Sequence, residues 1–171
     1  MDAEGKESVP RRQGFYVRRD GQWMQTADIA VRHRAGSRYA ALLEATAYRT
    51  ADGRLILAEA GFVFDGGSKP AVTWIIVGHP WADYLASYVI HDWQRAEAAD
   101  GFSQGRLTLD EAYRAMAKGD RDFKESQRWI LKHVLGREQS RWERLKIRVK
   151  FRVVQAHAVY RAVRKAIDRA A

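Results

Sequence analysis

The chain has 171 residues, a formal net charge of +9, 46% hydrophobic residues and 11% aromatic residues. This length and apolar content suit one folded domain with its own core and exclude a largely disordered chain. There is no cysteine, which excludes disulfides, thiolate metal sites and a cysteine nucleophile. Residues 1–13 lack the apolar segment of a signal peptide, and no apolar run approaches the roughly 20 residues that span a bilayer. We therefore expect a cytoplasmic protein with no transmembrane segment and with a flexible N-terminus over residues 1–13.

The first half of the chain predicts antiparallel strands. Residues 39–50 and 54–64 are the best strand candidates, and residues 51–53 between them contain the Asp-Gly pair that is typical of a hairpin turn. Residues 14–34 have weak periodicity and stay open between a strand and a short helix. The hairpin leads into residues 65–70, Asp-Gly-Gly-Ser-Lys-Pro, where two glycines and a proline predict a shaped loop.

The second half predicts helices over residues 81–97, 109–136 and 137–169. The second helix should begin with a capping box, because Thr108 is followed three residues later by Glu111. The expected fold is therefore α+β, with an N-terminal antiparallel, hairpin-rich sheet packed against about three C-terminal helices. Residues 14–136 form its core domain.

Polar residues interrupt the apolar rows of the first two helices. At 100° per residue, Asp92 falls in the middle of the apolar stripe of the first helix and His91 lies near its edge. Asp120 falls in the apolar row of the second helix, beside Gly119, which would let a neighbouring element approach closely. A buried carboxylate is costly unless it is paired, hydrogen-bonded or bound to a cation. We expect these three polar residues and Asp65 to converge in one pocket near the loop residues Gly66, Gly67 and Ser68.

A purely structural interpretation of the same residues stays open. Asp65 would be a turn acid, His91 would be a buried strut hydrogen-bonded to Asp120, and Asp92 would pair with Arg95 or Arg121, because buried ion pairs also produce such clusters.

The positive charge is concentrated at the C-terminus. Residues 137–171 contain eleven Lys or Arg residues and three acids, a net charge of +8. The predicted helix here is basic and amphipathic, and the cations opposite its apolar stripe are Arg144, Arg148, Arg152 and Lys165. Such a helix is either a solvated face or a contact for a polyanion such as nucleic acid, an anionic membrane or an acidic protein. Its wide apolar stripe packs on the protein body or on a second copy, so a homo-oligomer is one interpretation.

A family resemblance rests on the order of these motifs. Gly-Phe-x-x-Asp-Gly-x-Ser-x-Pro at residues 61–70, His-Asp at 91–92, Asp-x-x-Phe at 120–123 and Tyr-Arg-Ala-Val-Arg at 160–164 resemble the phage-associated domain-of-unknown-function family 1353. The resemblance covers residues 42–164. It implies a phage or prophage protein, in the bacterial host cytoplasm or in the virion, without an established activity. The family often has an aromatic residue a few positions after His-Asp, whereas Trp-Gln-Arg follows here.

The motif order is also similar to that of small calcium-dependent phospholipases. That similarity implies a hydrolase in which His91 is the general base that activates water for attack on an ester, and Asp120 orients the imidazole. Asp92 would bind calcium or another divalent cation beside loop carbonyls, and Asp65 would be a further ligand or would cap the loop.

Other interpretations compete with this hydrolase. A phosphohydrolase would recruit His79 or His33 as a further metal ligand, and a serine hydrolase built on Ser68 lacks a nucleophile-elbow sequence. A non-enzymatic accessory, virion or host-complex-binding protein that uses the basic C-terminal helix is the alternative from a different functional class.

Overall fold

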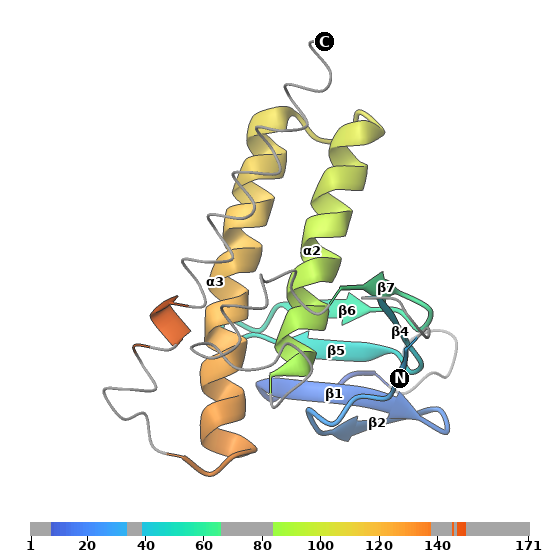
Figure 1. Cartoon of the computed structure of the whole chain (residues 1–171), viewed down its shortest axis with the longest axis vertical. Helices are drawn as coiled ribbons and strands as arrows, with labels where there is room; N and C mark the ends of the chain where they lie inside the picture. The colour runs from blue at the N-terminus through green and yellow to red at the C-terminus, as the bar shows by residue number, and fades with distance from the viewer. Residues whose placement is uncertain (1–7, 34–38, 66–83, 138–144, 146, 150–171) are drawn as a thin grey trace.

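The structure is a computed structural model that describes residues 8–33, 39–65, 84–137, 145 and 147–149. Its strands come first in the chain, and two long helices follow side by side (Figure 1). The predicted α+β class is confirmed.

The strands form two antiparallel sheets instead of one. The first sheet has the order β2-β1-β5-β6, with β1 (Gly14–Arg19), β2 (Gln22–Gln25), β5 (Thr46–Arg49) and β6 (Leu55–Ala58). The second has the order β3-β4-β7, with β3 (Val31–His33), β4 (Ala40–Leu42) and β7 (Val63–Phe64).

The segment that weak periodicity left unassigned forms β1, β2 and β3. A two-residue turn joins the first two strands, because Arg19 pairs with Gln22. Asp20 and Gly21 both have positive φ, 51° and 82°, as a type I′ turn requires. The Asp-Gly pair at these positions was a usable hairpin signal that the periodicity argument overlooked.

The predicted hairpin is present, and its two strands run through both sheets. Its turn is closed by hydrogen bonds between Thr50 and Arg54 and between Gly53 and Thr50, with Gly53 at a φ of 84°. The register of Arg49↔Leu55 next to the turn continues through Thr46↔Ala58 into Ala40↔Phe64. The two predicted strands therefore form one ribbon, which bends at residues 43–45 and 59–61 and contributes a strand pair to each sheet.

The helices are α2 (Leu85–Ser103) and α3 (Leu109–His133). The predicted capping box is confirmed, since the Thr108 side chain accepts from the Glu111 amide and the Glu111 carboxylate accepts from the Thr108 amide. α2 extends six residues beyond its predicted end, to Ser103, and the left-handed Gly105 (φ 69°) follows. The start predicted at residue 81 lies outside the described residues.

The core lies between the sheets and α2, and α3 packs mainly against α2 (Figure 1). Phe15 and Tyr48 pack together on the first sheet, with ring centroids 4.6 Å apart. Buried residues of the helices complete the core, among them Val89, Ile90 and Ile130. Of the third predicted helix, residue 145 and residues 147–149 are described and are helical, residue 137 is described and is not helical, and the remainder lies outside the described residues.

Candidate functional site

The two long helices approach closely where the predicted polar residues lie. Gly119 of α3 makes this approach feasible, because a Cβ at this position would lie only 3.3 Å from the Cβ of Gln94 on α2. The close approach expected at Gly119 is therefore present. It brings the middle of α3, including Asp120, against the part of α2 that carries His91 and Asp92.

The imidazole of His91 bridges two carboxylates. Its Nδ1 lies 3.2 Å from Asp92 Oδ1, and its Nε2 lies 3.1 Å from Asp120 Oδ1. The ring packs on Phe123 with centroids 4.9 Å apart, and His91 is only 4% exposed. The structure thus brings together three of the four predicted site residues, and it does so in the core.

Arg95, one helical turn after His91, completes this cluster. Its Nε donates to His91 Nε2 at 2.9 Å, and its Nη2 donates to Asp120 Oδ1 at 2.8 Å. The structural interpretation paired Asp92 with Arg95 or Arg121, and the first of these pairings is wrong because the guanidinium of Arg95 reaches across the helix interface to Asp120. We call His91, Asp92, Arg95 and Asp120 the His91 cluster.

The protonation of His91 selects its partners within the cluster. Nε2 cannot accept from Arg95 and donate to Asp120 at the same time. A neutral ring with its proton on Nδ1 donates to Asp92 and accepts from Arg95. A protonated ring donates to both carboxylates, while Arg95 keeps its second bond to Asp120.

The charged forms of His91 and Asp120 are favoured. Burial lowers the pKa of His91, but the hydrogen bonds to Asp120 and Asp92 outweigh it, so the pKa lies above the ordinary 6.5. Burial raises the pKa of Asp120, but the hydrogen bonds from His91 and Arg95 outweigh it, so the pKa lies below the ordinary 3.8. These shifts favour a protonated ring between two carboxylates, whereas the bond that Arg95 Nε donates to His91 Nε2 needs the neutral ring, and in both forms the two ring nitrogens have protein partners.

One carboxylate oxygen of the His91 cluster has no hydrogen-bond partner among the described residues. Asp92 Oδ1 contacts His91, whereas Asp92 Oδ2 is buried and has no hydrogen-bond partner among the described residues. A buried carboxylate oxygen without a partner is costly. This oxygen is the feature of the cluster that most resembles part of a cation site.

The predicted metal site is not assembled by the described residues. Asp65 directly follows β7 and is half-buried. No group of three or more His, Asp or Glu side chains among residues 8–33, 39–65, 84–137, 145 and 147–149 is arranged to hold a metal ion. The loop residues Gly66, Gly67 and Ser68, and also His79, lie outside the described residues.

Comparison with known families identifies the family of this chain. The model of the family described as "Protein of unknown function (DUF1353)" matches residues 40–132, more than half of the sequence. The chain belongs to this family. No curated protein and no solved structure matches the chain.

The DUF1353 match includes the whole His91 cluster and also a second buried carboxylate that the sequence analysis overlooked. Asp122 accepts from both terminal nitrogens of Arg54, at 2.7 and 3.2 Å, and from Gln94 Nε2 at 2.8 Å. The hydrogen bonds to Asp122 raise the pKa of Arg54. These contacts tie the hairpin turn and α2 to α3. The sequence did contain a signal for this contact. Asp122 follows Asp120 by two residues, and on a helix this spacing directs the two side chains toward different neighbours.

A third contact fixes the DUF1353 helix α3 to the sheet. Glu125 Oε1 accepts from the Tyr48 hydroxyl at 3.1 Å, the Gln13 side chain at 3.1 Å and the Ala51 amide at 2.9 Å. Burial is the main cause that raises the pKa of Tyr48. Asp120, Asp122 and Glu125 of α3 therefore all have defined partners.

Of the four cations predicted for polyanion binding, only Arg148 lies within the described residues, where it is helical and exposed. Arg144, Arg152 and Lys165 lie outside the described residues, and all four cations lie beyond the DUF1353 match. Within the described part of the chain, no helix is long and apolar enough to cross a membrane.

Proposed function

We propose that the protein is a non-enzymatic accessory protein of a phage or prophage, which binds an acidic or polyanionic partner through its exposed cations. In this proposal the His91 cluster holds α2 against α3. The observation that carries the proposal is the state of His91, which is 4% exposed and has both ring nitrogens within hydrogen-bond distance of protein partners.

A general base needs a nitrogen within reach of the proton that it removes. Before a ring nitrogen could contact a substrate, His91 would have to lose its hydrogen bond to Asp92 at Nδ1, or its hydrogen bonds to Arg95 and Asp120 at Nε2. Each of these bonds involves a charged group and is stronger than an ordinary neutral hydrogen bond. The arrangement therefore supports a structural role for the ring, and it leaves function to the surface.

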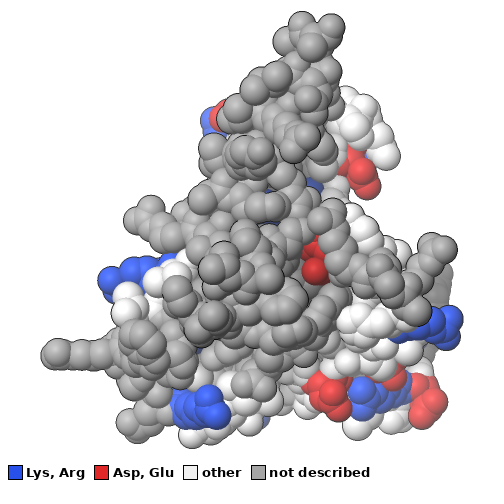
Figure 2. All heavy atoms as spheres, viewed as in Figure 1, with Lys and Arg blue, Asp and Glu red and all other residues white. Residues whose placement is uncertain are grey.

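The basic composition supports the second half of the proposal. A net charge of +9 favours association with anionic partners. On the face shown in Figure 2, blue and red groups are intermixed at the lower right, over the sheets, whereas blue groups at the lower left stand without red neighbours.

The test uses His91→Gln and Asp92→Asn, with heparin resin as a general polyanion probe. We expect the wild type to be retained and to elute only as salt rises, and we expect both folded variants to elute at the same salt as the wild type. No ester hydrolysis should be detected with or without calcium. Loss of retention in Asp92→Asn, whose circular dichroism is unchanged, would contradict the proposal.

A calcium-dependent ester hydrolase is the second candidate, and the buried Asp92 Oδ2 without a hydrogen-bond partner favours it. Asp92 would hold the cation, with Asp65 as a further ligand, and the cation would polarise the ester carbonyl. His91 would take a proton from water, and Asp120 would stabilise the resulting imidazolium.

Calcium titration by calorimetry separates this candidate from the first. The hydrolase requires binding that disappears in Asp92→Asn, and calcium-dependent turnover that disappears in His91→Gln while the fold is retained. If the wild type shows neither calcium binding nor calcium-dependent turnover, the hydrolase candidate is excluded.

A further inference from the structure

Five cations follow one side of α3. At 100° per residue they lie within a sector of roughly 80°, and the first and last are 18 residues apart, which is about 27 Å along the helix. We call them the α3 basic row, which consists of Arg114, Lys118, Arg121, Arg128 and Lys132.

The members of the row are exposed and mostly unpaired. Arg114 pairs with Asp110 one turn earlier. Within residues 84–137 and the other described ranges, the other four members have no ion pair. Glu125 falls in the same sector, but its carboxylate is occupied by the sheet. Four exposed cations therefore share this side of α3 with Glu125, and none of the four is ion-paired to an acid among the described residues.

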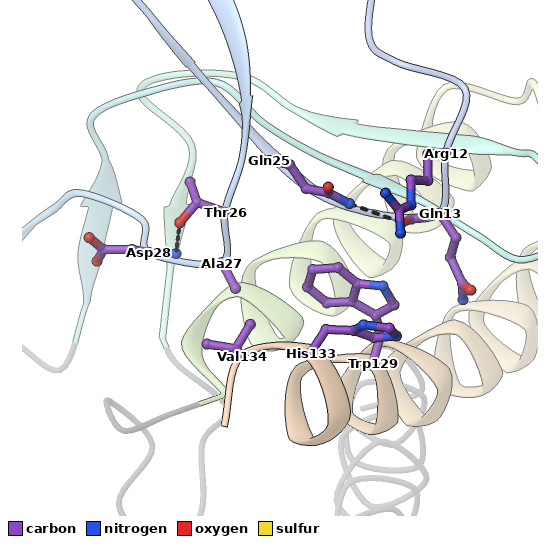
Figure 3. A pocket seen from close by; sticks show the side chains of 9 residues that line it. All are labelled: Arg12, Gln13, Gln25, Thr26, Ala27, Asp28, Trp129, His133 and Val134. Atoms are coloured by element: carbon purple, nitrogen blue, oxygen red, sulfur yellow. Dashed lines mark hydrogen bonds between the residues drawn. The ribbon is translucent and has the colours of Figure 1, made fainter. Parts of the chain in front are cut away.

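The C-terminal end of the row borders two hollows. Arg128 and Lys132 line one of about 580 Å³ together with Trp129, His133 and Arg137. The other, of about 440 Å³, is also lined by Trp129 and His133. Figure 3 shows the indole and imidazole side by side in the second hollow, and their centroids are 5.1 Å apart with an interplanar angle of 28°. A partly exposed stacked pair thus stands beside the cations.

We propose that the α3 basic row binds the phosphates of single-stranded nucleic acid, with a base stacking at the Trp129–His133 pair. Lines of cations beside exposed aromatic rings are how proteins bind single strands without sequence preference, since every base has a face that can stack. The inference rests on the proposed function, because it names the partner class of that binding surface.

A membrane surface fits the row less well. A helix that lies on a membrane needs exposed apolar residues beside its cations. The exposed apolar residues of α3 are Leu109 and Tyr113, and at 100° per residue they lie about 100° or more from the middle of the row. The row therefore favours a partner that is recognised by charge along a line.

The test measures the affinity of the full chain for a fluorescein-labelled single-stranded 20-nucleotide oligothymidine by anisotropy at several salt concentrations. Four phosphate contacts predict a slope of log K against log salt of about −3. The triple variant Arg121→Gln, Arg128→Gln, Lys132→Gln should reduce that slope by about 2 and weaken binding on the order of tenfold or more.

A matched control removes the same charge elsewhere. The triple variant Arg11→Gln, Arg32→Gln, Arg106→Gln changes exposed cations away from α3. It should retain most of the affinity and the slope. Equal losses in both triple variants would show that net charge binds the strand, and would overturn the inference.

The stacking step has its own variant. His133 is exposed, so His133→Ala should fold normally. It should weaken single-strand binding by several-fold without changing the salt slope, and it should leave binding of a duplex of the same length unchanged. An unchanged single-strand affinity would overturn the stacking step.

The two proposals fail in different ways. Retention on heparin without binding of the oligonucleotide would overturn the nucleic-acid inference and point to an acidic protein partner, while the proposed function stands. Ester turnover lost in His91→Gln would overturn the proposed function, whatever the row binds.

Discussion

The acids and the cations of α3 carry charge in opposite ways. Asp120, Asp122 and Glu125 each accept hydrogen bonds from partners on α2, the hairpin or the N-terminal segment. Four cations of the α3 basic row have no ion pair within the described ranges.

This difference separates a structural use of charge from a surface available for binding. Charges withdrawn from water must be matched, and matched buried groups specify which helix meets which strand. Exposed cations contribute little to stability and remain free to attract an anionic partner. Variants that remove one of the partnered acids should therefore destabilise the protein, whereas variants of the unpaired cations should not.

The largest effect is expected for Asp120→Ala. It leaves His91 and Arg95 at the helix interface without their shared carboxylate, and removal of one partner from such a cluster should lower the free energy of unfolding by about 3 kcal/mol. Urea unfolding followed by circular dichroism measures it. Asp110→Ala, on the exposed part of the same helix, is the control and should change the free energy by about 0.5 kcal/mol or less. Equal losses would show that the inner carboxylate has no special structural role.

Gly119→Leu should produce the next largest loss. Its side chain would meet Gln94 where a Cβ alone would already lie at 3.3 Å, and overpacking should cost about 2 kcal/mol. Ala117→Leu places the same side chain on the exposed face and serves as the control. If thermal unfolding shows both variants to be as stable as the wild type, the close approach of the helices is contradicted.

Thr108→Ala should cost about 1 kcal/mol, because it removes the side chain that accepts from the Glu111 amide. Thr108→Ser retains the acceptor and should recover most of the loss in the same unfolding experiment. A serine variant as unstable as the alanine variant would exclude the capping bond as the cause.

The smallest effect is expected from pH, because burial opposes both shifts. The raised pKa of His91 stabilises the fold fully below the unfolded value near 6.5, and this contribution is lost as pH rises through the higher folded value. The lowered pKa of Asp120 stabilises the fold above 3.8, and this is lost as pH falls through the lower folded value. Urea midpoints from about pH 5 to 9 should decline on the alkaline side in the wild type and decline less in His91→Gln. A steeper decline in the variant would contradict the direction of the His91 shift.

The sequence predicted features whose cause is local. The capping box at Thr108, the turn at residues 51–53 and the apolar row that turned Asp120 inward all depend on residues within a few positions of each other. The periodicity placed Asp92 in the middle of the apolar stripe and His91 near its edge, whereas His91 is the more buried of the two. The small size of Gly119 also indicated where the helices meet.

Features that depend on contacts between distant segments could not be predicted in this way. The pairing of Arg54 with Asp122 joins residues 68 positions apart, and the choice of Asp120 over Asp92 by Arg95 depends on the distance between two helices. The bend that divides the long ribbon between two sheets leaves the register unchanged, so the alternation of side chains carries no sign of it.

The most direct test of the central claim is the nitrogen NMR spectrum of the His91 ring at neutral pH. A buried structural ring should exchange its ring protons slowly with water and titrate above its ordinary range. A ring that exchanges its protons rapidly and titrates near 6.5 would contradict that claim and restore His91 as a candidate base.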